Sequence, residues 1–267
     1  MLAKINQYRQ NLSLPLLGNK LGTKLANKKP QSQYRFEWVE DLKQLKQVQK
    51  FRAEQFSEQF GIQFKNGLDQ DLYDLDCEHA VLRDKFSNEI VAYTRLKLLQ
   101  GHELSQSYSA QEFDVSSLSH LSNIVEIGRT CVHPRYRKGR ALSILWLNLV
   151  PTVLWKMKAK HLIGCVSIRL QDNLARAYYT HQHIKQLPAK QRIQIAAQPA
   201  YEPMHPEFSF AQDERMPKLF QVYLSMNAQL STQAFHDQDF NCLDYFVFLD
   251  VNDVAKKFVH NKMLQRQ

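Results

Sequence analysis

The stretch EIGRTCVHPRYRKGRA, residues 126–141, contains the pattern that decides the fold. It begins within an apolar run at 123–132 that is typical of a β-strand, and a His-Pro pair then marks the exit into a loop of cations. A long apolar segment follows at 141–158 and is expected to be a helix with a kink at Pro151. A strand, a basic loop and a helix in this order aim the free backbone N–H groups of the helix N-terminus at the loop.

The segments on either side supply the other elements of a sheet. Before this stretch, we expect a strand at 34–39, an amphipathic helix at 41–60 bounded by Asp41 and Gly61, and a hairpin of strands at 79–84 and 89–99. After it, we expect a strand at 161–168 buried on both faces, helices at 172–183 and 216–230, a strand at 242–251 and a helix at 254–265. This order predicts an α/β (α+β) protein with helices on both faces of a mixed central sheet.

The positive charge of the chain is concentrated at its start. The formal net charge is +9, and residues 1–30 carry six Lys and Arg residues and no acid. We therefore expect residues 1–33 to form a basic arm that can contact the anionic cytoplasmic face of the inner membrane, with a solvated tail as the alternative. Residues 34–267 are expected to form a single domain. No apolar window is long enough to span a membrane and no secretory signal is expected, which predicts a cytoplasmic protein.

The four cysteines are far apart in the sequence, without a C-x-x-C pair. This spacing indicates reduced thiols rather than disulfides, and it does not match the usual ligand pattern of a structural zinc site. We therefore expect no bound metal. Cys131 could be a nucleophile and His133 a base, but a buried thiol and a strand exit are the favoured interpretations.

Glu126 and Arg129 place two opposite charges in the apolar strand. A carboxylate between Val125 and Ile127 must be solvated, paired or functional. Regular alternation puts Glu126 on one face and Arg129 on the other, so both can serve one site only if a β-bulge intervenes, for which Gly128 is the expected position. An ion pair on an edge strand is the alternative.

The loop after this strand gathers cations around one glycine. Backbone at Gly139 could approach a phosphate closely, and the helix N-terminus and the neighbouring cations would attract it. A solvated basic loop is the alternative.

The order of elements resembles the Gcn5-related N-acyltransferase fold. In that family an R/Q-x-x-G-x-G/A loop holds the cofactor pyrophosphate. Residues 136–141 read YRKGRA, so the glycine and alanine are kept while Tyr136 replaces the usual Arg or Gln. This departure argues against acetyl-CoA as the acyl donor.

Further motifs resemble enzymes that take acyl chains from acyl carrier protein. They are FRAEQF at 51–56, DLYD at 71–74, DLDCEH at 74–79, TRL at 94–96 and EIGR at 126–129. They resemble the acyl-homoserine-lactone synthases, and the ornithine lipid N-acyltransferases better still. The latter share the continuation RTCVHP, the strand motif GCVS at 164–167 and a C-terminal block that includes DQDFN at 237–241. The resemblance covers about residues 35–251.

The resemblance implies transfer of a 3-hydroxy fatty acyl group from acyl carrier protein to the α-amino group of L-ornithine, which gives lyso-ornithine lipid. The donor would be the 4'-phosphopantetheine thioester, with no permanently bound cofactor. Glu126 matches the family's proposed base, and Arg129 would share the catalytic site. The other expected site residues are Arg52, Asp71, Asp74 and Arg95 for orienting the amino acid and bracing the site; Arg135, Arg137, Lys138, Gly139, Arg140 and Ala141 for the phosphopantetheine and its carrier; and Phe51 and Phe56 for the acyl chain.

Three alternatives stay open. An acyl-homoserine-lactone synthase or another N-acyl amino acid synthase would share the same motifs but use another amine. A basic nucleic-acid-binding protein would explain the charge, but a recognition helix with clustered cations is missing, so nucleic acid is not expected as a partner. Trp146 and Trp155 could line an acyl pocket, although core packing is the favoured interpretation.

Overall fold

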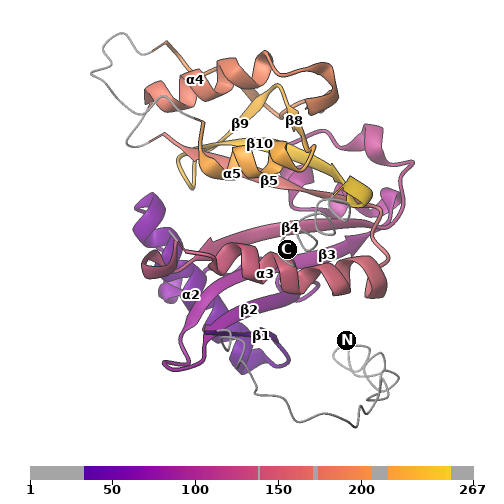
Figure 1. The fold of residues 1–267 in the computed structure, drawn as a ribbon. Coiled ribbons are helices and arrows are strands. Elements are labelled where there is room, and N and C mark those ends of the chain that lie inside the picture. The colour runs from indigo at the N-terminus through magenta and orange to yellow at the C-terminus, as the bar shows by residue number, and fades with distance from the viewer. Residues whose placement is uncertain (1–32, 138, 171–173, 206–215, 254–267) are drawn as a thin grey trace, which may run out of the picture. The chain divides into compact units, whose positions relative to one another are not determined.

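The computed structural model describes residues 33–137, 139–170, 174–205 and 216–253 (Figure 1). Nearly all of the expected basic arm at 1–33, the cation Lys138 and the expected helix at 254–265 lie outside the described residues. Residues 172 and 173, where the expected helix at 172–183 begins, also lie outside them. The other expected strands and helices fall within the described residues.

A mixed sheet of ten strands forms the centre of the described chain (Figure 1). The strands are β1 (Tyr34–Trp38), β2 (Glu78–Asp84), β3 (Ile90–Leu99), β4 (Ile124–Val132), β5 (His161–Arg169), β6 (Arg192–Ile193), β7 (Ala200–Tyr201), β8 (Gln229–Ser231), β9 (Ala234–Asp237) and β10 (Cys242–Asp250). Their order is β1-β2-β3-β4-β5-β10-β8-β6, with β9 paired to β10 and β7. The β4–β5 and β6–β8 pairs are parallel and the other pairs are antiparallel. The expected hairpin and the central position of the strand at 161–168 are confirmed.

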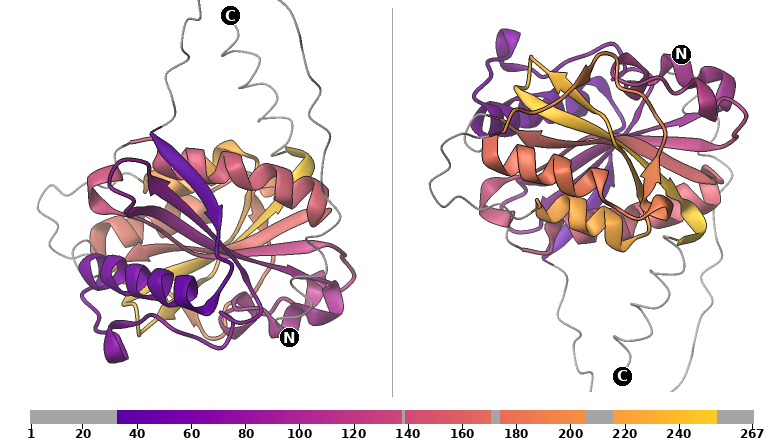
Figure 2. Two further views of the ribbon diagram at one scale, coloured as in Figure 1. Left: turned by 90° about the horizontal axis from the view of Figure 1, so that it is seen from below. Right: turned by 90° about the horizontal axis from the view of Figure 1, so that it is seen from above.

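Helices cover both faces of this sheet, as the sequence predicted (Figure 2). The α-helices are α2 (Leu42–Phe60), α3 (Ala141–Pro151), α4 (Leu174–Lys185) and α5 (Lys218–Ser225). Short helical turns are η1 (Lys65–Gly67), η2 (Gly101–Gln106), η3 (Ser109–Gln111), η4 (Ser116–Leu118), η5 (Pro134–Tyr136), η6 (Thr152–Lys156) and η7 (Ala189–Gln191). One face packs against α2 through Phe51 and Phe56, and the other packs against α3 through Leu145 and Leu149.

The ends of α2 follow from single residues. Asp41 Oδ1 accepts a hydrogen bond from the Gln44 backbone N–H at 2.7 Å, which satisfies a donor that has no partner within the helix. Gly61 adopts the left-handed conformation at φ 73°, and its N–H donates to the Ser57 carbonyl. Both expected caps are therefore confirmed.

Two helices differ from their expected extents. The helix at 141–158 changes to a π-helical turn after Pro151, because proline has no backbone N–H to continue the α-helical bonding pattern. The helix expected at 216–230 ends at Ser225, and residues 229–231 instead form β8. Pairing of Leu230 with Val247 of β10 overrides the local helical preference.

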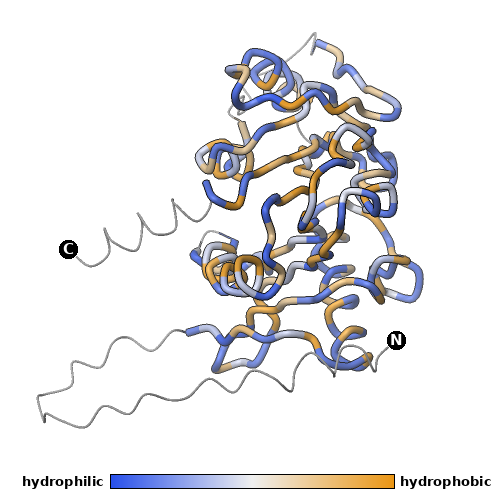
Figure 3. Tube along the Cα trace, turned by 90° about the vertical axis from the view of Figure 1, so that its right-hand side faces the viewer, coloured by the Kyte–Doolittle hydropathy of each residue, from blue (hydrophilic) through white to orange (hydrophobic). Residues whose placement is uncertain are grey.

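Apolar positions are concentrated on the strands and on the helix faces that cover them (Figure 3). Within the described residues, no helix combines the length and the hydropathy that a membrane crossing would require.

Strands β4 and β5 separate part-way along their length. They pair only from Ile124 to Glu126, opposite His161 to Ile163, although β4 continues to Val132. Gly164 follows the last pair, and a Cβ atom there would lie 2.4 Å from the Ile127 carbonyl oxygen. A larger residue at 164 would therefore clash with backbone, and the fork between the two strands begins at this point.

Candidate active site

A cleft of about 170 Å³ lies where β4 and β5 separate. Its walls come from strands β3, β4, β5, β9 and β10, from helices α2 and α5, from the start of η3, and from the loops before β2 and before β10. The charged and polar side chains that line it include Lys97, Arg95, Tyr73, Tyr108, Ser109, Glu126, Arg129, Asp237 and Asp244. Glu126 and Arg129, the two residues that we expected to be catalytic, thus line the same cleft.

A β-bulge in β4 explains how both charges reach it. The pairing of β3 with β4 shifts register between Tyr93 and Arg95, and Arg129 has φ 52°. The bulge was expected from the sequence, but the left-handed residue is Arg129 and not Gly128. This conformation costs a non-glycine residue on the order of 1 kcal/mol. Between these pairs β4 has one residue more than β3, which breaks the regular alternation of its side chains. Glu126 and Arg129 therefore both contact Tyr108.

The Glu126 carboxylate is held by three donors. Its Oε1 accepts from the Ser109 backbone N–H at 2.8 Å and from Ser109 Oγ at 2.7 Å, and its Oε2 accepts from the Tyr108 N–H at 3.0 Å. The side chain is buried, with 7 % exposure. The edge-strand ion pair considered from the sequence is not present among the described residues, because the partners of Glu126 are uncharged.

Arg129 is fixed between two aromatic rings. Its guanidinium carbon lies 4.8 Å from the Tyr108 ring centre and 5.1 Å from that of Phe240. Its nitrogens reach Asp71 at 3.3 Å and Asp69 at 3.5 Å. Burial by itself lowers the pKa of Arg129, but Tyr108 and these carboxylates raise it overall, so the group stays charged.

Three arginines and three aspartates form one ion-pair network behind this wall. Arg52 Nε lies 2.8 Å from Asp69, Arg52 Nη1 lies 2.7 Å from Asp74, and Arg95 Nη1 lies 2.6 Å from Asp71 and 2.8 Å from Asp74. Arg129 completes the network through Asp69 and Asp71. The six formal charges cancel, and the acidic loop at 68–77 is thereby tied to α2, β3 and β4.

This network changes the interpretation of four expected site residues. Arg52 is 0 % exposed, and neither Arg52 nor Asp74 lines the cleft. Burial by itself would raise the pKa of Asp71 and Asp74, but hydrogen bonds and charges from Arg95 and Arg52 lower both below the usual range. Of the four, only Arg95 lines the cleft. The bracing that the sequence suggested is present, whereas the acids suggested for an amine's side chain are already neutralised.

The cleft contains a second acidic group that the sequence analysis did not single out. Asp237 at the end of β9 and Asp244 in β10 line it, and their charges raise the pKa of the buried Glu112 nearby, in addition to the larger effect of burial. Ligand atoms of Asp237, Cys242 and Asp244 lie within 4.8 Å of one another. The motif DQDFN contained Asp237, but only the pairing of β9 with β10 brings it to Asp244.

The thiols behave as buried groups. Burial raises the pKa of Cys131 well above the usual range, and that residue packs with Phe51 and Phe56 away from the cleft lining. Cys165 and Cys242 line the cleft, and burial raises their pKa values as well. A thiolate nucleophile is disfavoured at all three positions.

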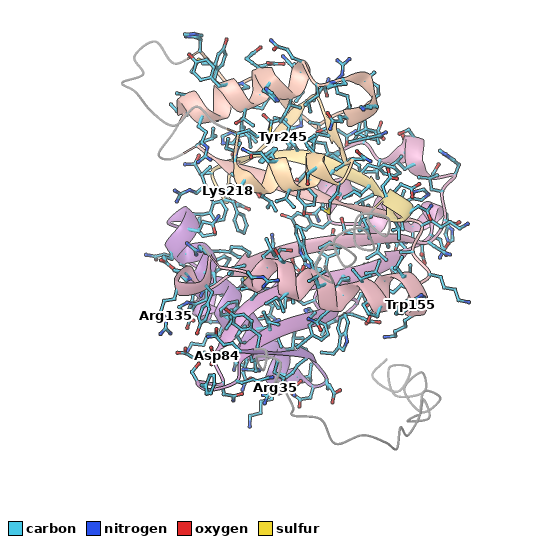
Figure 4. All side chains as sticks on the ribbon, in the orientation of Figure 1. Arg35, Asp84, Arg135, Trp155, Lys218 and Tyr245 are labelled. Carbon is cyan, nitrogen blue, oxygen red and sulfur yellow. The ribbon has the colours of Figure 1, made fainter. Side chains whose placement is uncertain are left out.

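The apolar wall of the cleft is aromatic. Phe56, Phe60 and Phe240 line it and pack edge to face or tilted, with ring centres 5.4 to 6.1 Å apart. Phe51 is buried beneath this wall and does not line it. Trp146 packs against Tyr223, as expected for core, but Trp155 is 73 % exposed, so core packing is wrong for it (Figure 4).

The cation loop lies outside the cleft lining, between β4 and α3. Arg135 pairs with Glu89 at 2.9 Å on the surface (Figure 4), and Arg137 reaches Glu58 at 3.7 Å. The helix begins at Ala141, with Arg140 as its N-cap. Gly139 N–H donates to the Tyr136 carbonyl at 3.0 Å. The loop and the helix N-terminus are adjacent as expected, whereas phosphate binding by them stays a prediction.

Comparison with known proteins agrees with this geometry. Residues 51–147 match the family model described as "Acetyltransferase (GNAT) domain". An L-ornithine N(alpha)-acyltransferase of Rhodobacter capsulatus is 27% identical over 84% of this chain and 92% of its own length. One of Agrobacterium fabrum is 29% identical over 72% and 70%. This chain carries a GNAT domain and is a relative of the L-ornithine N(alpha)-acyltransferases.

Solved structures with similarity to the chain include two acyl-homoserine-lactone synthases. LasI has a TM-score of 0.46 and 12% identity, covering 82% of this chain and 89% of LasI. The CoA-dependent MesI has a TM-score of 0.48 and 12% identity, covering 84% and 95%. The GNAT fold expected from the element order is confirmed by the domain match, and the mixed sheet with helices on both faces agrees with it.

Proposed function

We propose that this chain is an N-acyltransferase that moves a 3-hydroxy fatty acyl group from acyl carrier protein to the α-amino group of L-ornithine. The product would be lyso-ornithine lipid. The observation that carries the proposal is the forked β4–β5 cleft, whose bulge brings Glu126 and Arg129 together in a relative of L-ornithine N(alpha)-acyltransferases.

The fork supplies a place for the thioester. Beyond Glu126, β5 no longer pairs with β4, so backbone at Ile127, Gly128 and Thr130 faces the cleft. An extended pantetheine arm can take the place of the missing strand, and backbone N–H groups near the bulge can stabilise the oxyanion that forms during attack. The aromatic wall of Phe56, Phe60 and Phe240 would receive the acyl end next to the thioester.

The surface loop supports a carrier protein as donor. The phosphate of the arm would lie at the N-terminus of α3, near Gly139, Arg140 and Ala141, where free backbone N–H groups favour an anion. Arg135 and Arg137 lie at the outer edge and would attract an acidic carrier, since each pairs only with an exposed carboxylate. Lys138 is expected to add to this attraction.

Proton transfer would pass through Ser109. An amine attacks a thioester only when unprotonated. As the amine nitrogen bonds to the thioester carbon, it would pass a proton to Ser109 Oγ, directly or through a water, while Oγ passes its own proton to Glu126 Oε1, 2.7 Å away. When the C–S bond breaks, the leaving thiolate takes up a proton and Glu126 is restored as a carboxylate.

The carboxylate of the amino acid needs a cation in the cleft. Arg95 and Arg129 line it but are already paired with aspartates. Lys97 also lines it and has no ion pair among the residues that the structure describes; its Nζ lies 5.6 Å from the Tyr73 ring centre. We assign Lys97 to the carboxylate, with Arg95 and Arg129 shaping the cleft around the reacting atoms.

Membrane contact belongs to the proposal as well. Residues 34–267 would act as one catalytic domain at the cytoplasmic face of the inner membrane, and the basic residues 1–33 would hold it against anionic lipid, each cation contributing about 1 kcal/mol. The lipid nature of the product makes such contact useful.

The decisive experiment supplies the purified chain with a 3-hydroxyacyl group on either acyl carrier protein or CoA, and with L-ornithine, S-adenosylmethionine or another amino acid. We expect rapid acylation of ornithine from the carrier protein and slow reaction from CoA. Turnover of S-adenosylmethionine alone would identify an acyl-homoserine-lactone synthase and refute the proposal. Extraction of lipids from cells that express the chain should show an ornithine-containing lyso-lipid.

A further inference from the structure

We propose that Glu112, Asp237 and Asp244 form a subsite for the side-chain ammonium of a diamino acid acceptor, which makes these acids the determinants of acceptor specificity. This inference rests on the proposed function, because it concerns the amine that this cleft acylates. It assigns the cation of the acceptor to a different set of acids from those in the loop at 68–77.

The three carboxylates converge from separate elements. Glu112 follows η3, Asp237 ends β9, and Asp244 lies in β10 opposite Ser167 of β5. Glu112 is 3 % exposed and Asp244 is 4 % exposed. Asp237 and Asp244 line the same cleft as Glu126. A ligand in the cleft can therefore contact Asp237 and Asp244, although Asp244 is shielded from bulk solvent.

These acids lack a counter-charge within the described part of the chain. None of the three forms an ion pair there, whereas Asp69, Asp71 and Asp74 are all paired with arginine. Arg129, whose charge lowers the pKa of Asp244, is already engaged by Asp69 and Asp71. Buried carboxylates are normally paired or coordinate a cation, so this group calls for a positively charged ligand.

Glu112 provides an independent indication. Its side chain is buried, yet Oε2 has no hydrogen-bond partner. An unpartnered carboxylate oxygen in the interior is costly, and a bound ammonium would satisfy it. Burial and the neighbouring Asp244 and Asp237 charges raise the pKa of Glu112, and burial likewise raises that of Asp244, so both acids favour the protonated form until a cation binds beside them.

The position of the group suits the length of a diamino acid. Glu126 binds Ser109, whose Oγ lies 3.7 Å from Cys165 Sγ, and the Glu112 side chain interacts with the same thiol. An α-amine at Ser109 would therefore extend its side chain past Cys165 towards the three acids. The three acids would bind the side-chain ammonium while the α-amine reacts near Ser109, so the cleft would select a diamino acid over an apolar amino acid.

A metal ion is the rival ligand, and the donor set disfavours it. The third atom of the compact group is the soft sulfur of Cys242, beside oxygens of Asp237 and Asp244. Two carboxylates do not complete the oxygen set of a hard-cation site, and one thiol with two carboxylates is not the usual Cys and His set of a zinc site. An ammonium needs only hydrogen-bond acceptors, which the carboxylates provide.

The test compares L-ornithine with L-norvaline, which has the same carbon skeleton without the δ-amine. In the Asp244→Asn variant we expect kcat/KM for ornithine to fall about 30- to 1000-fold, the range for breaking one buried charge pair, while kcat/KM for norvaline changes less than about threefold. Asp239→Asn removes an exposed acid two residues from Asp237 and should leave both values unchanged. Equal losses for both amino acids, or an unchanged value for ornithine, would overturn the subsite.

Calorimetric binding to the full chain separates this inference from the proposed function. If no amino acid is acylated, the proposed function fails, yet binding of ornithine more tightly than norvaline, with the difference abolished by Asp244→Asn and by Glu112→Gln, would still support the subsite. Equal binding of the two amino acids would refute it. Titration with CaCl2 or ZnCl2 alone forms the third arm, and tight metal binding that ornithine cannot displace would assign the acids to a metal instead.

Discussion

Ser109 donates two hydrogen bonds to one oxygen of Glu126, from its backbone N–H at 2.8 Å and from its Oγ at 2.7 Å. The carboxylate therefore has a local structural role, since it anchors the start of η3, in addition to any role in chemistry. The two roles make different predictions for conservative substitutions.

Glu126→Gln should reduce kcat by about 10²- to 10⁴-fold while the protein remains folded, because the amide keeps the shape of the side chain but is a very poor base. The measurement is steady-state acyl transfer to ornithine, with circular dichroism for the fold. Ser109→Ala should reduce kcat by a smaller factor, because the backbone bond to Glu126 remains. Near-wild-type turnover in Glu126→Gln would remove it as the base.

Replacing Arg52 by methionine should destabilise the chain strongly. Its guanidinium is fully buried against Asp69 and Asp74, and removal of one partner leaves uncompensated buried charge, at a cost of about 3–5 kcal/mol. Urea unfolding should show this difference. The matched control is Arg135→Met, whose exposed pair with Glu89 should contribute less than about 1 kcal/mol. Similar losses in the two variants would contradict the network.

Gly164→Ala should disturb the fork itself. The new Cβ would lie 2.4 Å from the Ile127 carbonyl oxygen, so the backbone of β4 must move, with an expected loss of about 1–3 kcal/mol and most of the activity. Gly128→Ala is the control for stability, because its Cβ would come no closer than 3.8 Å, to Arg95 Nε. If Gly164→Ala proves as stable as Gly128→Ala, the close approach of the two strands is not required.

Neutralising Arg137 and Arg140 together should raise the KM for acyl carrier protein more than the KM for ornithine, because the loop is proposed to bind the donor. The effect should diminish as salt is added, since exposed charges are screened. Lys156→Ala is a suitable control, as it removes an exposed cation that pairs with Glu78. An unchanged KM for the carrier would make the cluster a solvated basic loop.

The buried acids predict a pH dependence of stability. Burial raises the pKa of Asp244 in the folded state, as does the proximity of Asp237, while Ser167, Cys242 and Arg129 lower it. The contribution of Asp244 to the free energy of unfolding is therefore fully present below its pKa in the unfolded chain, about 3.9. This contribution is lost as the pH rises through the higher pKa of Asp244 in the folded protein. The burial-raised pKa of Glu112, beside Asp244 and Asp237, extends this loss to higher pH. Thermal unfolding across this range should show a smaller decline in Asp244→Asn, and an equal decline would contradict the raised value.

Local sequence patterns were enough to predict much of the fold. The strand at 123–132, the caps Asp41 and Gly61 and the hairpin at 79–99 depend on neighbours in sequence, so periodicity and capping chemistry could predict them. The C-terminal part was harder to predict, because β8 and β9 depend on pairing with other strands, β10 and β6 for β8, and β10 and β7 for β9. A segment with helical preference therefore ended five residues early.

Local sequence patterns were enough to predict the order of strands and helices and to mark Glu126 and Arg129 as opposite charges in an apolar strand, because these features depend on neighbouring residues. The family resemblance supplied the acyltransferase fold. Which charges are available to a ligand depends on contacts between distant segments. Asp71 and Asp74 have no visible partner in the sequence but are neutralised by arginines from three elements. Asp237 and Asp244 come together in the cleft with Glu112 nearby, and none of these three acids has an ion pair among the described residues. Charge compensation depends on distance in space, and that distance is set by contacts between segments that are far apart in the sequence, such as the pairing of β10 with β5.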